Sequence, residues 1–183
     1  MNKSNVILCG FMGCGKSTVG KRLSKITGRP FVDMDYYIEE KSNMTVKEIF
    51  EKYGEAYFRD LEYNTAVELA QKDNMIISAG GGTLLFERNV QALSQTGTIV
   101  LLNVSLSTLR YRLRNDTKRP LLQRPDKNKA MAEMYEQRMP LYTRAADITV
   151  RGAKPPVKVC MDICKRLSIP MVKSPRTHTS AQL

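Results

Sequence analysis

The chain has 183 residues, 42% of them hydrophobic, which suits one domain with a buried core. No apolar run reaches the roughly 18 residues of a membrane-spanning helix. The first residues lack the apolar region and the small-residue cleavage site of a signal peptide. We therefore expect a cytoplasmic protein without a membrane partner. The net charge of +11 leaves a nucleic-acid partner to be considered.

Five short apolar runs, rich in Val and Ile and mostly without alternation, predict strands that are buried on both faces. They are VILC (6–9), FVDM (31–34), MIISA (75–79), TIVLLNV (98–104) and ITV (148–150). Helices are expected at 16–27, from Thr45 onward with a break near Gly54, and at about 86–95, 105–115, 127–139 and 155–167. This alternation predicts an α/β fold with three layers, α/β/α, around a five-stranded parallel sheet.

The predicted organisation is a single domain over residues 1–167, followed by a disordered tail over 168–183. The tail is rich in Ser, Thr and Pro and has little apolar periodicity. No coiled-coil pattern occurs, so we expect a monomer.

The positive charge is concentrated in one segment. Residues 110–129 hold eight basic and two acidic residues, a net of +6. A concentrated cluster suits a polyphosphate held at one site better than a long duplex. We therefore expect no nucleic-acid partner, although an ATP-driven nucleic-acid-binding or switch protein stays a competing interpretation.

The strongest motif directly follows the first predicted strand. Residues 10–17, GFMGCGKS, fit the phosphate-loop pattern G-x-x-x-x-G-K-[ST], with a helix expected immediately after. Backbone N–H groups of such a loop surround a phosphate at a helix N-terminus. Lys16 can reach the β- and γ-phosphates, and the Ser17 hydroxyl is a candidate Mg²⁺ ligand. The predicted nucleotide-binding residues are Gly13, Cys14, Gly15, Lys16, Ser17 and Thr18, in a fold of the P-loop NTPase type similar to nucleoside-monophosphate kinases.

A second site is expected where the other strands end, because ligands bind at the carboxyl ends of parallel strands. Asp33 and Asp35 follow the second strand, and residues two apart in an extended segment point the same way. Two such carboxylates suit a Mg²⁺ ion and a hydroxyl acceptor that needs a base. The alternative is that Asp35 only caps a helix that starts at Tyr36.

Three consecutive glycines, Gly80, Gly81 and Gly82, follow the third strand. The simplest interpretation is a flexible turn. Directly after a buried strand, however, consecutive glycines more often mark a close approach of the backbone to a ligand. We therefore expect the glycine backbone to approach a ligand here.

Arginines would complete this acceptor site. Arg59, with Glu62 three residues later to orient it, and Arg138 could hold an acceptor's carboxylate by two hydrogen bonds each. Arg119 lies in the basic segment, which could close over ATP as a lid at about 110–129. Each arginine taken alone would more often be a solvated surface residue.

Six motifs occur in the order found in one family, and the sequence resembles shikimate kinase. They are GFMGCGKST (10–18), DMD (33–35), GEAYFR (54–59), GGG (80–82), KRPLL (118–122) and RMPLY (138–142). The resemblance covers residues 5 to about 167. It implies transfer of the γ-phosphoryl group of ATP, with Mg²⁺, to the 3-hydroxyl of shikimate, in the pathway to chorismate and aromatic amino acids.

The resemblance also implies which residues bind the acceptor. They lie in an acceptor-binding region of about 33–62, in the glycine triplet and in the RMPLY motif. Asp35 would contact the acceptor hydroxyl and serve as the base, and Asp33 would lie near the magnesium, through water. Arg59 and Arg138 would bind the shikimate carboxylate. The backbone of Gly80–Gly82 would contact the ring hydroxyls.

On the nucleotide side, the resemblance makes Lys16 and Arg119 catalytic together with Asp35, with Arg119 reaching the ATP phosphates from the lid. The adenine-contacting loop would fall around 151–156, where Lys154 is the nearest match. One departure is Ala79, where the family often has a Thr that could order a magnesium-bound water.

Other small-molecule P-loop kinases remain as alternatives. A nucleoside monophosphate would call for stacking and amide contacts to its base, whereas two arginines and paired aspartates suit a small carboxylated polyol. Gluconate fits that description too, so the physical argument alone does not separate it from shikimate.

Overall fold

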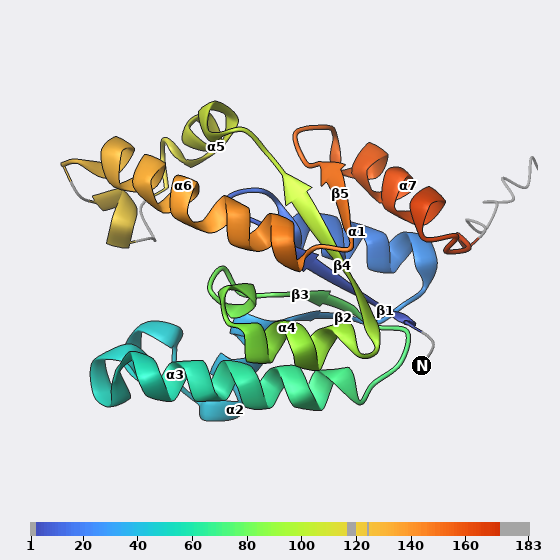
Figure 1. Ribbon diagram of the computed structural model, residues 1–183, viewed down its shortest axis with the longest axis horizontal. Helices are drawn as coiled ribbons and strands as arrows, with labels where there is room; N and C mark the ends of the chain where they lie inside the picture. The colour runs from blue at the N-terminus through green and yellow to red at the C-terminus, as the bar shows by residue number, and fades with distance from the viewer. Residues whose placement is uncertain (1–2, 117–119, 124, 173–183) are drawn as a thin grey trace, which may run out of the picture.

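The computed structural model describes residues 3–116, 120–123 and 125–172 (Figure 1). Arg119, which the sequence predicts to be catalytic, lies outside the described residues, as do residues 173–183 of the expected tail.

Five parallel strands form one sheet in the order β2-β3-β1-β4-β5, as the sequence predicts. They are β1 (Asn5–Cys9), β2 (Phe31–Asp33), β3 (Ile76–Ser78), β4 (Gly97–Asn103) and β5 (Ile148–Arg151). The central strand β1 is buried at every position, which explains its unbroken apolar run. The chain crosses from one side of β1 to the other between β3 and β4. A ligand crevice is expected at such a switch point, beside the end of β1.

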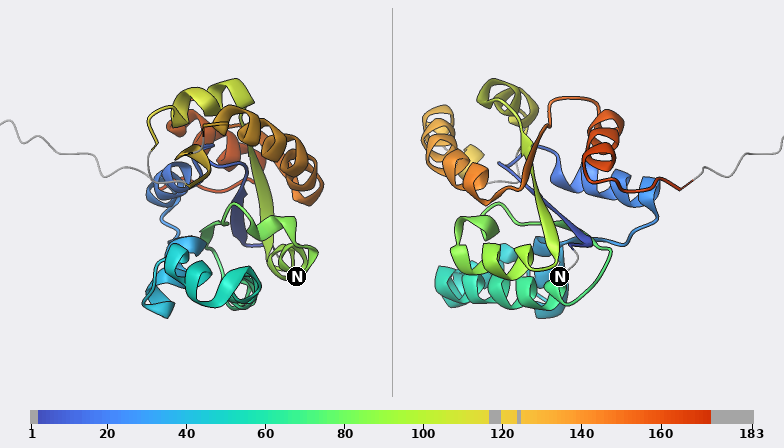
Figure 2. Two further views of the ribbon diagram at one scale, coloured as in Figure 1. Left: turned by 90° about the vertical axis from the view of Figure 1, so that its left-hand side faces the viewer. Right: turned by 45° about the vertical axis from the view of Figure 1, so that its right-hand side comes forward.

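Helices cover both faces of the sheet, so the predicted three-layer α/β/α architecture is confirmed. The helices are α1 (Lys16–Thr27), α2 (Met34–Ser42), α3 (Val46–Ala70), α4 (Glu87–Ser94), α5 (Leu106–Leu113), α6 (Lys127–Ala145) and α7 (Pro156–Arg166). Helices α1 and α7 pack together on one face, and α4 and α6 lie on the other, with α3 outside α4 (Figure 2). None of the helices in the described part of the chain combines the length and the apolar character needed to cross a bilayer.

Two predicted helix boundaries in the N-terminal half concern the site. The capping box of Thr45 and Glu48 opens α3, and the expected break occurs at Gly54, where φ is 80° and ψ is 176°. The expected extended geometry of Asp33 and Asp35 is wrong. Helix α2 already begins at Met34, so Asp33 is its N-cap and Asp35 lies in its first turn.

Helix α6 is longer than predicted. The sequence predicts its end at about residue 139; the next residue, Pro140, has no N–H to donate to the helix. The helix instead continues through Pro140 to Ala145, anchored by the buried ring of Tyr142. Burial of one large side chain therefore outweighs one lost helical bond. As a result, Arg138 and Tyr142 lie on the same helix, about one turn apart.

The tail expected from residue 168 is wrong for its first five residues. Ile169 is buried in the core, and its N–H donates to the carbonyl of Cys164. The N–H of Val172 donates to the carbonyl of Ile26, at the end of α1. The apolar residues of this short segment, not its Ser and Pro content, decide its structure.

Gly20 offers a test of how tightly α1 packs on β2. A Cβ at this position would lie 2.2 Å from the ring of Phe31. Alanine gains about 1 kcal/mol of helix propensity, but overpacking costs about 1–3 kcal/mol. We expect Gly20→Ala to lower the Tm by a few degrees in thermal unfolding, and Lys21→Ala, at an exposed neighbour, to leave it unchanged. A rise in Tm would show that the ring moves aside freely.

Candidate active site

A cavity of about 300 Å³ opens at the carboxyl ends of β1, β2 and β3. The phosphate loop forms one wall, and the ends of β2 and β3 form the other. Its lining residues are Met12, Gly13, Gly15, Lys16, Ser17, Thr18, Asp33, Asp35, Ser78, Ala79 and Gly81. The cavity therefore joins the two sites that the sequence predicts separately.

The phosphate loop takes the backbone path that its glycines allow. Gly15, with φ at 102°, leads directly into α1, whose first turn holds no acidic residue. The helix N-terminus is thus open to an anion. The ammonium of Lys16 donates to the carbonyl of Gly10, 2.9 Å away, so the lysine lies along the loop.

Ser17 and Asp33, the predicted metal pair, lie in contact. The Ser17 hydroxyl donates to Oδ2 of Asp33 at 2.6 Å. A hydroxyl beside a carboxylate is a donor set that suits Mg²⁺, which takes oxygen ligands and usually completes its shell with phosphates and water. The described residues form no cluster of three or more acidic, Cys or His side chains that could hold a metal alone. The two residues therefore fit a magnesium ion that arrives with a nucleotide.

Asp35 lies deeper, between the phosphate loop and the glycine triplet. Burial raises the pKa of its carboxyl to about 6, and the negative charges of Asp33 and Glu62 add to the rise, while Lys16 opposes it. A Cβ on Gly80 would lie 2.3 Å from Oδ1 of Asp35, so the carboxylate packs directly on the glycine backbone. A carboxyl with such a pKa can accept a proton near neutral pH.

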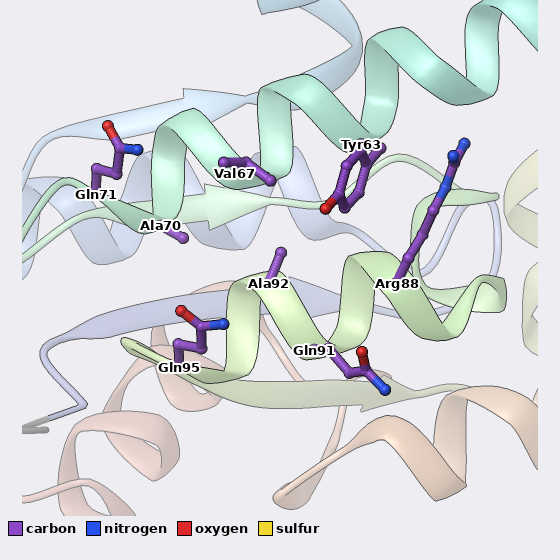
Figure 3. Close-up of a pocket in the computed structure, with 8 residues that line it drawn as sticks. All are labelled: Tyr63, Val67, Ala70, Gln71, Arg88, Gln91, Ala92 and Gln95. Carbon is purple, nitrogen blue, oxygen red and sulfur yellow. The ribbon is translucent and has the colours of Figure 1, made fainter.

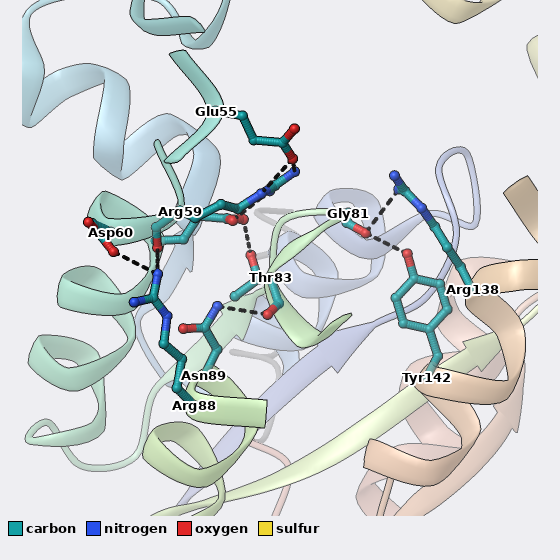
Figure 4. A network of polar contacts seen from close by, with 10 residues as sticks. Glu55, Arg59, Asp60, Gly81, Thr83, Arg88, Asn89, Arg138 and Tyr142 are labelled. Carbon is teal, nitrogen blue, oxygen red and sulfur yellow. Dashed lines mark hydrogen bonds and ion pairs between the residues drawn. The ribbon is translucent and has the colours of Figure 1, made fainter. Parts of the chain in front are cut away.

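Arg59 is held from several sides (Figure 4). Its Nη1 donates to Glu62 at 2.7 Å, and its Nε and Nη2 both donate to Oε1 of Glu55. The guanidinium also lies over three phenyl rings, those of Phe50, Phe58 and Phe86, at 5.2 to 5.9 Å from their centroids. Such contacts fix the position and the plane of the guanidinium.

Helix α4 supports the turn that carries this arginine. The guanidinium of Arg88 donates to the carbonyl of Arg59 at 2.9 Å and to Asp60 at 2.8 Å (Figure 4). It also lies over the ring of Tyr63. These contacts tie α3 to α4 beside the site.

Arg138 approaches the glycine triplet from the opposite side, on α6 (Figure 4). Its Nη1 donates to the carbonyl of Gly81 at 3.3 Å, and the same carbonyl accepts a hydrogen bond from the Tyr142 hydroxyl. Burial raises the pKa of Tyr142 to about 12, so the phenol keeps its proton and remains a donor. The two predicted arginines thus lie on either side of the triplet.

Several supporting residues escape the sequence analysis. Tyr142 lies inside a quoted motif without an assigned role, because its partner is 61 residues away in the chain. Arg112 lies in the basic segment and donates to the carbonyls of Cys14 and Gly152, which ties the phosphate loop to the loop after β5. Lys154 pairs with Asp162 on α7, 4.0 Å away, and does not line the cavity.

A separate cavity of about 330 Å³ lies between α3 and α4 (Figure 3). Its eight lining residues are Tyr63, Val67, Ala70, Gln71, Arg88, Gln91, Ala92 and Gln95. Apart from the Tyr63 phenol, these residues carry no carboxylate, thiol or hydroxyl that could act as a base or a nucleophile. The cavity at the strand ends is therefore the better candidate for a catalytic site.

Comparison with known proteins indicates one family. The model of the shikimate kinase family matches residues 12–168. The chain is 41% identical over 150 residues to a shikimate kinase of Sulfurihydrogenibium sp., covering 82% of this chain and 89% of that protein. The solved structure of a shikimate kinase from Acinetobacter baumannii in complex with shikimate is 32% identical, with a TM-score of 0.84, covering 90% of this chain and 93% of that one. A gluconokinase from Sinorhizobium meliloti, 15% identical with a TM-score of 0.52 and coverage of 92% and 98%, shares the fold alone.

Proposed function

The chain belongs to the shikimate kinase family, and we propose that it transfers the γ-phosphoryl group of ATP to the 3-hydroxyl of shikimate, giving shikimate 3-phosphate and ADP. One observation carries the assignment of the site. The partly buried carboxyl of Asp35 lies between the phosphate loop and a glycine triplet that has an arginine on each side.

The donor half binds the nucleotide. Gly13, Gly15, Lys16 and Thr18 line this wall of the cavity. The backbone N–H groups of Gly13, Cys14 and Gly15 would surround the β-phosphate, and Lys16 would neutralise the β- and γ-phosphates. Ser17 and Asp33 would hold the Mg²⁺ that accompanies the nucleotide. Such an ion would supply positive charge next to the phosphates when bound.

The acceptor half positions shikimate. Arg59 and Arg138 bind its carboxylate, and the backbone of Gly80–Gly82 contacts its ring hydroxyls. Asp35 orients the 3-hydroxyl and accepts its proton as the oxygen attacks the γ-phosphorus. The bond from this phosphorus to the β,γ-bridging oxygen breaks, and ADP leaves with the electron pair.

We also retain the other expectations about the chain. Residues of about 33–62 form the acceptor region, and the segment 110–129 closes as a lid, in which Arg119 contacts the phosphates. Lys154 contributes to the adenine loop. The protein acts in the cytoplasm as a monomer on two small-molecule substrates, without a nucleic-acid partner. Light scattering tests the monomeric state, and an electrophoretic mobility shift assay with DNA and RNA tests the absence of nucleic-acid binding.

The function is tested by coupled ADP release with Mg-ATP. Shikimate, gluconate and nucleoside monophosphates are offered as acceptors at equal concentrations. We expect turnover with shikimate in excess of the others, and activity that is lost with EDTA and restored by Mg²⁺. Turnover with gluconate or a nucleotide but not with shikimate would overturn the assignment.

Gly82 gives a steric test of the acceptor half. A Cβ at this position would lie 2.4 Å from Nη1 of Arg59, whereas one on Gly81 would meet nothing within 4 Å. Neither glycine has a positive φ, so alanine is compatible with both backbones. We expect Gly82→Ala to raise the shikimate KM roughly tenfold, equivalent to about 1.4 kcal/mol, with the ATP KM unchanged.

The comparison variant is Gly81→Ala, for which we expect a clearly smaller rise in the shikimate KM. Equal effects of the two substitutions would show that the triplet matters for its flexibility and not for its contact with Arg59. Steady-state kinetics with each substrate varied at saturation of the other gives both constants.

A further inference from the structure

We propose that Thr83 is a positioning residue for shikimate recognition: its hydroxyl fixes the Glu62 carboxylate that holds Arg59. The inference rests on the proposed function, since it concerns the arginine assigned to the acceptor carboxylate. Thr83 directly follows the glycine triplet, at the start of the 3-10 helix η1 (Thr83–Leu85), and no motif of the sequence includes it.

The chain of contacts is continuous (Figure 4). The Thr83 hydroxyl donates to Oε1 of Glu62 at 2.6 Å, and Nη1 of Arg59 donates to Oε2 of the same carboxylate at 2.7 Å. Thr83 and Glu62 are 0% and 1% exposed. A carboxylate removed from water needs a donor at each oxygen. Thr83 supplies one of them, and without it the carboxylate is free to turn away from the arginine.

Thr83 is itself fixed from a third element. The side-chain amide of Asn89, on α4 and fully buried, donates to the Thr83 carbonyl at 2.8 Å. Its Oδ1 has no hydrogen-bond partner within the described residues, so the contribution of this amide is the bond to Thr83. The N–H of Thr83 donates to the carbonyl of Gly80. The hydroxyl therefore has a defined place relative to the glycine triplet.

This arrangement differs from the support that Glu55 gives. Glu55 is 63% exposed and meets the opposite edge of the guanidinium, so water can replace it. Glu62 is enclosed, and only Thr83 and Arg59 donate side-chain hydrogen bonds to it among the described residues. The same hydroxyl would lie 2.9 Å from a Cβ on Gly80, where Asp35 is also in contact. Thr83 thus joins the arginine to the wall that carries the base.

The experiment compares Thr83→Val, which keeps the shape but removes the hydroxyl, with Thr83→Ser, which keeps the hydroxyl. Thr96→Val is the matched control, because the Thr96 hydroxyl also makes an internal bond, to the carbonyl of Ala70, at the far end of the sheet. For each protein, kcat and KM are measured for shikimate and for ATP. The kcat/KM for shikimate is also compared with that for its methyl ester, which lacks the negative charge.

We expect Thr83→Val to raise the shikimate KM about tenfold with the ATP KM within twofold of wild type. The preference for shikimate over the methyl ester should fall by a similar factor. Thr83→Ser should restore both, and Thr96→Val should change neither. Because the preference is a ratio, it stays measurable even if part of the Thr83→Val protein is unfolded.

Three results would overturn the inference: an unchanged preference in Thr83→Val, an equal rise of the shikimate and ATP KM values, or equal damage in Thr83→Ser. Failure of the proposed function is separate from these, because it is seen in the wild-type protein, which would then not turn over shikimate at all.

Discussion

Asp35→Asn is expected to lower kcat with shikimate by a factor of roughly 10²–10⁴, the range that loss of a general base gives. The carboxyl lies in the cavity beside Lys16 and packs on Gly80, where an acceptor hydroxyl would be placed. Asparagine keeps the size and one acceptor oxygen but cannot take up a proton. The shikimate KM should therefore change far less than kcat.

The same substitution is expected to stabilise the protein without ligands at neutral pH. The pKa of Asp35 rises from its usual 3.8 to about 6 on folding, mainly because of burial. Above pH 6, the Asp35 carboxyl is ionised in both the folded and the unfolded chain. Its charge then lowers the free energy of unfolding by an amount on the order of 2–3 kcal/mol. Below the unfolded pKa, both are protonated and this effect disappears.

Thermal unfolding in EDTA tests whether Asp35→Asn stabilises the protein as expected. The Tm of Asp35→Asn should exceed that of wild type at pH 8, and the difference should shrink as the pH falls through 6 toward 4. Asp73→Asn, at an exposed position, should show neither the gain in stability nor the loss of kcat. A near-normal kcat in Asp35→Asn would remove Asp35 as the base, whatever its effect on stability.

The sequence predicts the fold well because its signals are local. The phosphate loop and the five strands each occupy one short, nearly continuous segment, and burial on both faces leaves unbroken apolar runs. The end of α6 is the instructive error. The sequence predicts its end at about residue 139, whereas the packing of Tyr142 against a distant segment extends it to Ala145.

The site residues, too, are found where their signal is local and missed where it depends on distant contacts. Asp33 and Asp35 are found from their position after a strand, although their expected extended geometry is wrong, because the direction of a side chain depends on where α2 begins. Thr83 is not found at all. Its partner Glu62 is 21 residues earlier, and the value of its hydroxyl arises only when α3 and η1 pack together.

Arg59→Lys is the second substitution for which we expect a large effect, and it should change the shikimate KM more than kcat. The guanidinium donates to Glu62 with Nη1 and to Glu55 with Nε and Nη2, which leaves further N–H groups for an acceptor carboxylate. A lysine ammonium has three donors on a flexible stem and no fixed plane. It cannot hold Glu62 and also present a paired donor to shikimate.

The shikimate KM of Arg59→Lys should therefore rise about 10- to 100-fold, the equivalent of a lost charge-assisted hydrogen-bond pair. The ATP KM should stay unchanged, and kcat at saturating shikimate should fall less than in Asp35→Asn. Arg166→Lys, at an arginine that pairs with Asp162 on the far helix α7, serves as the control and should alter neither constant. A rise in the ATP KM would instead place Arg59 at the nucleotide, and the division of the cavity into donor and acceptor halves would have to be reversed.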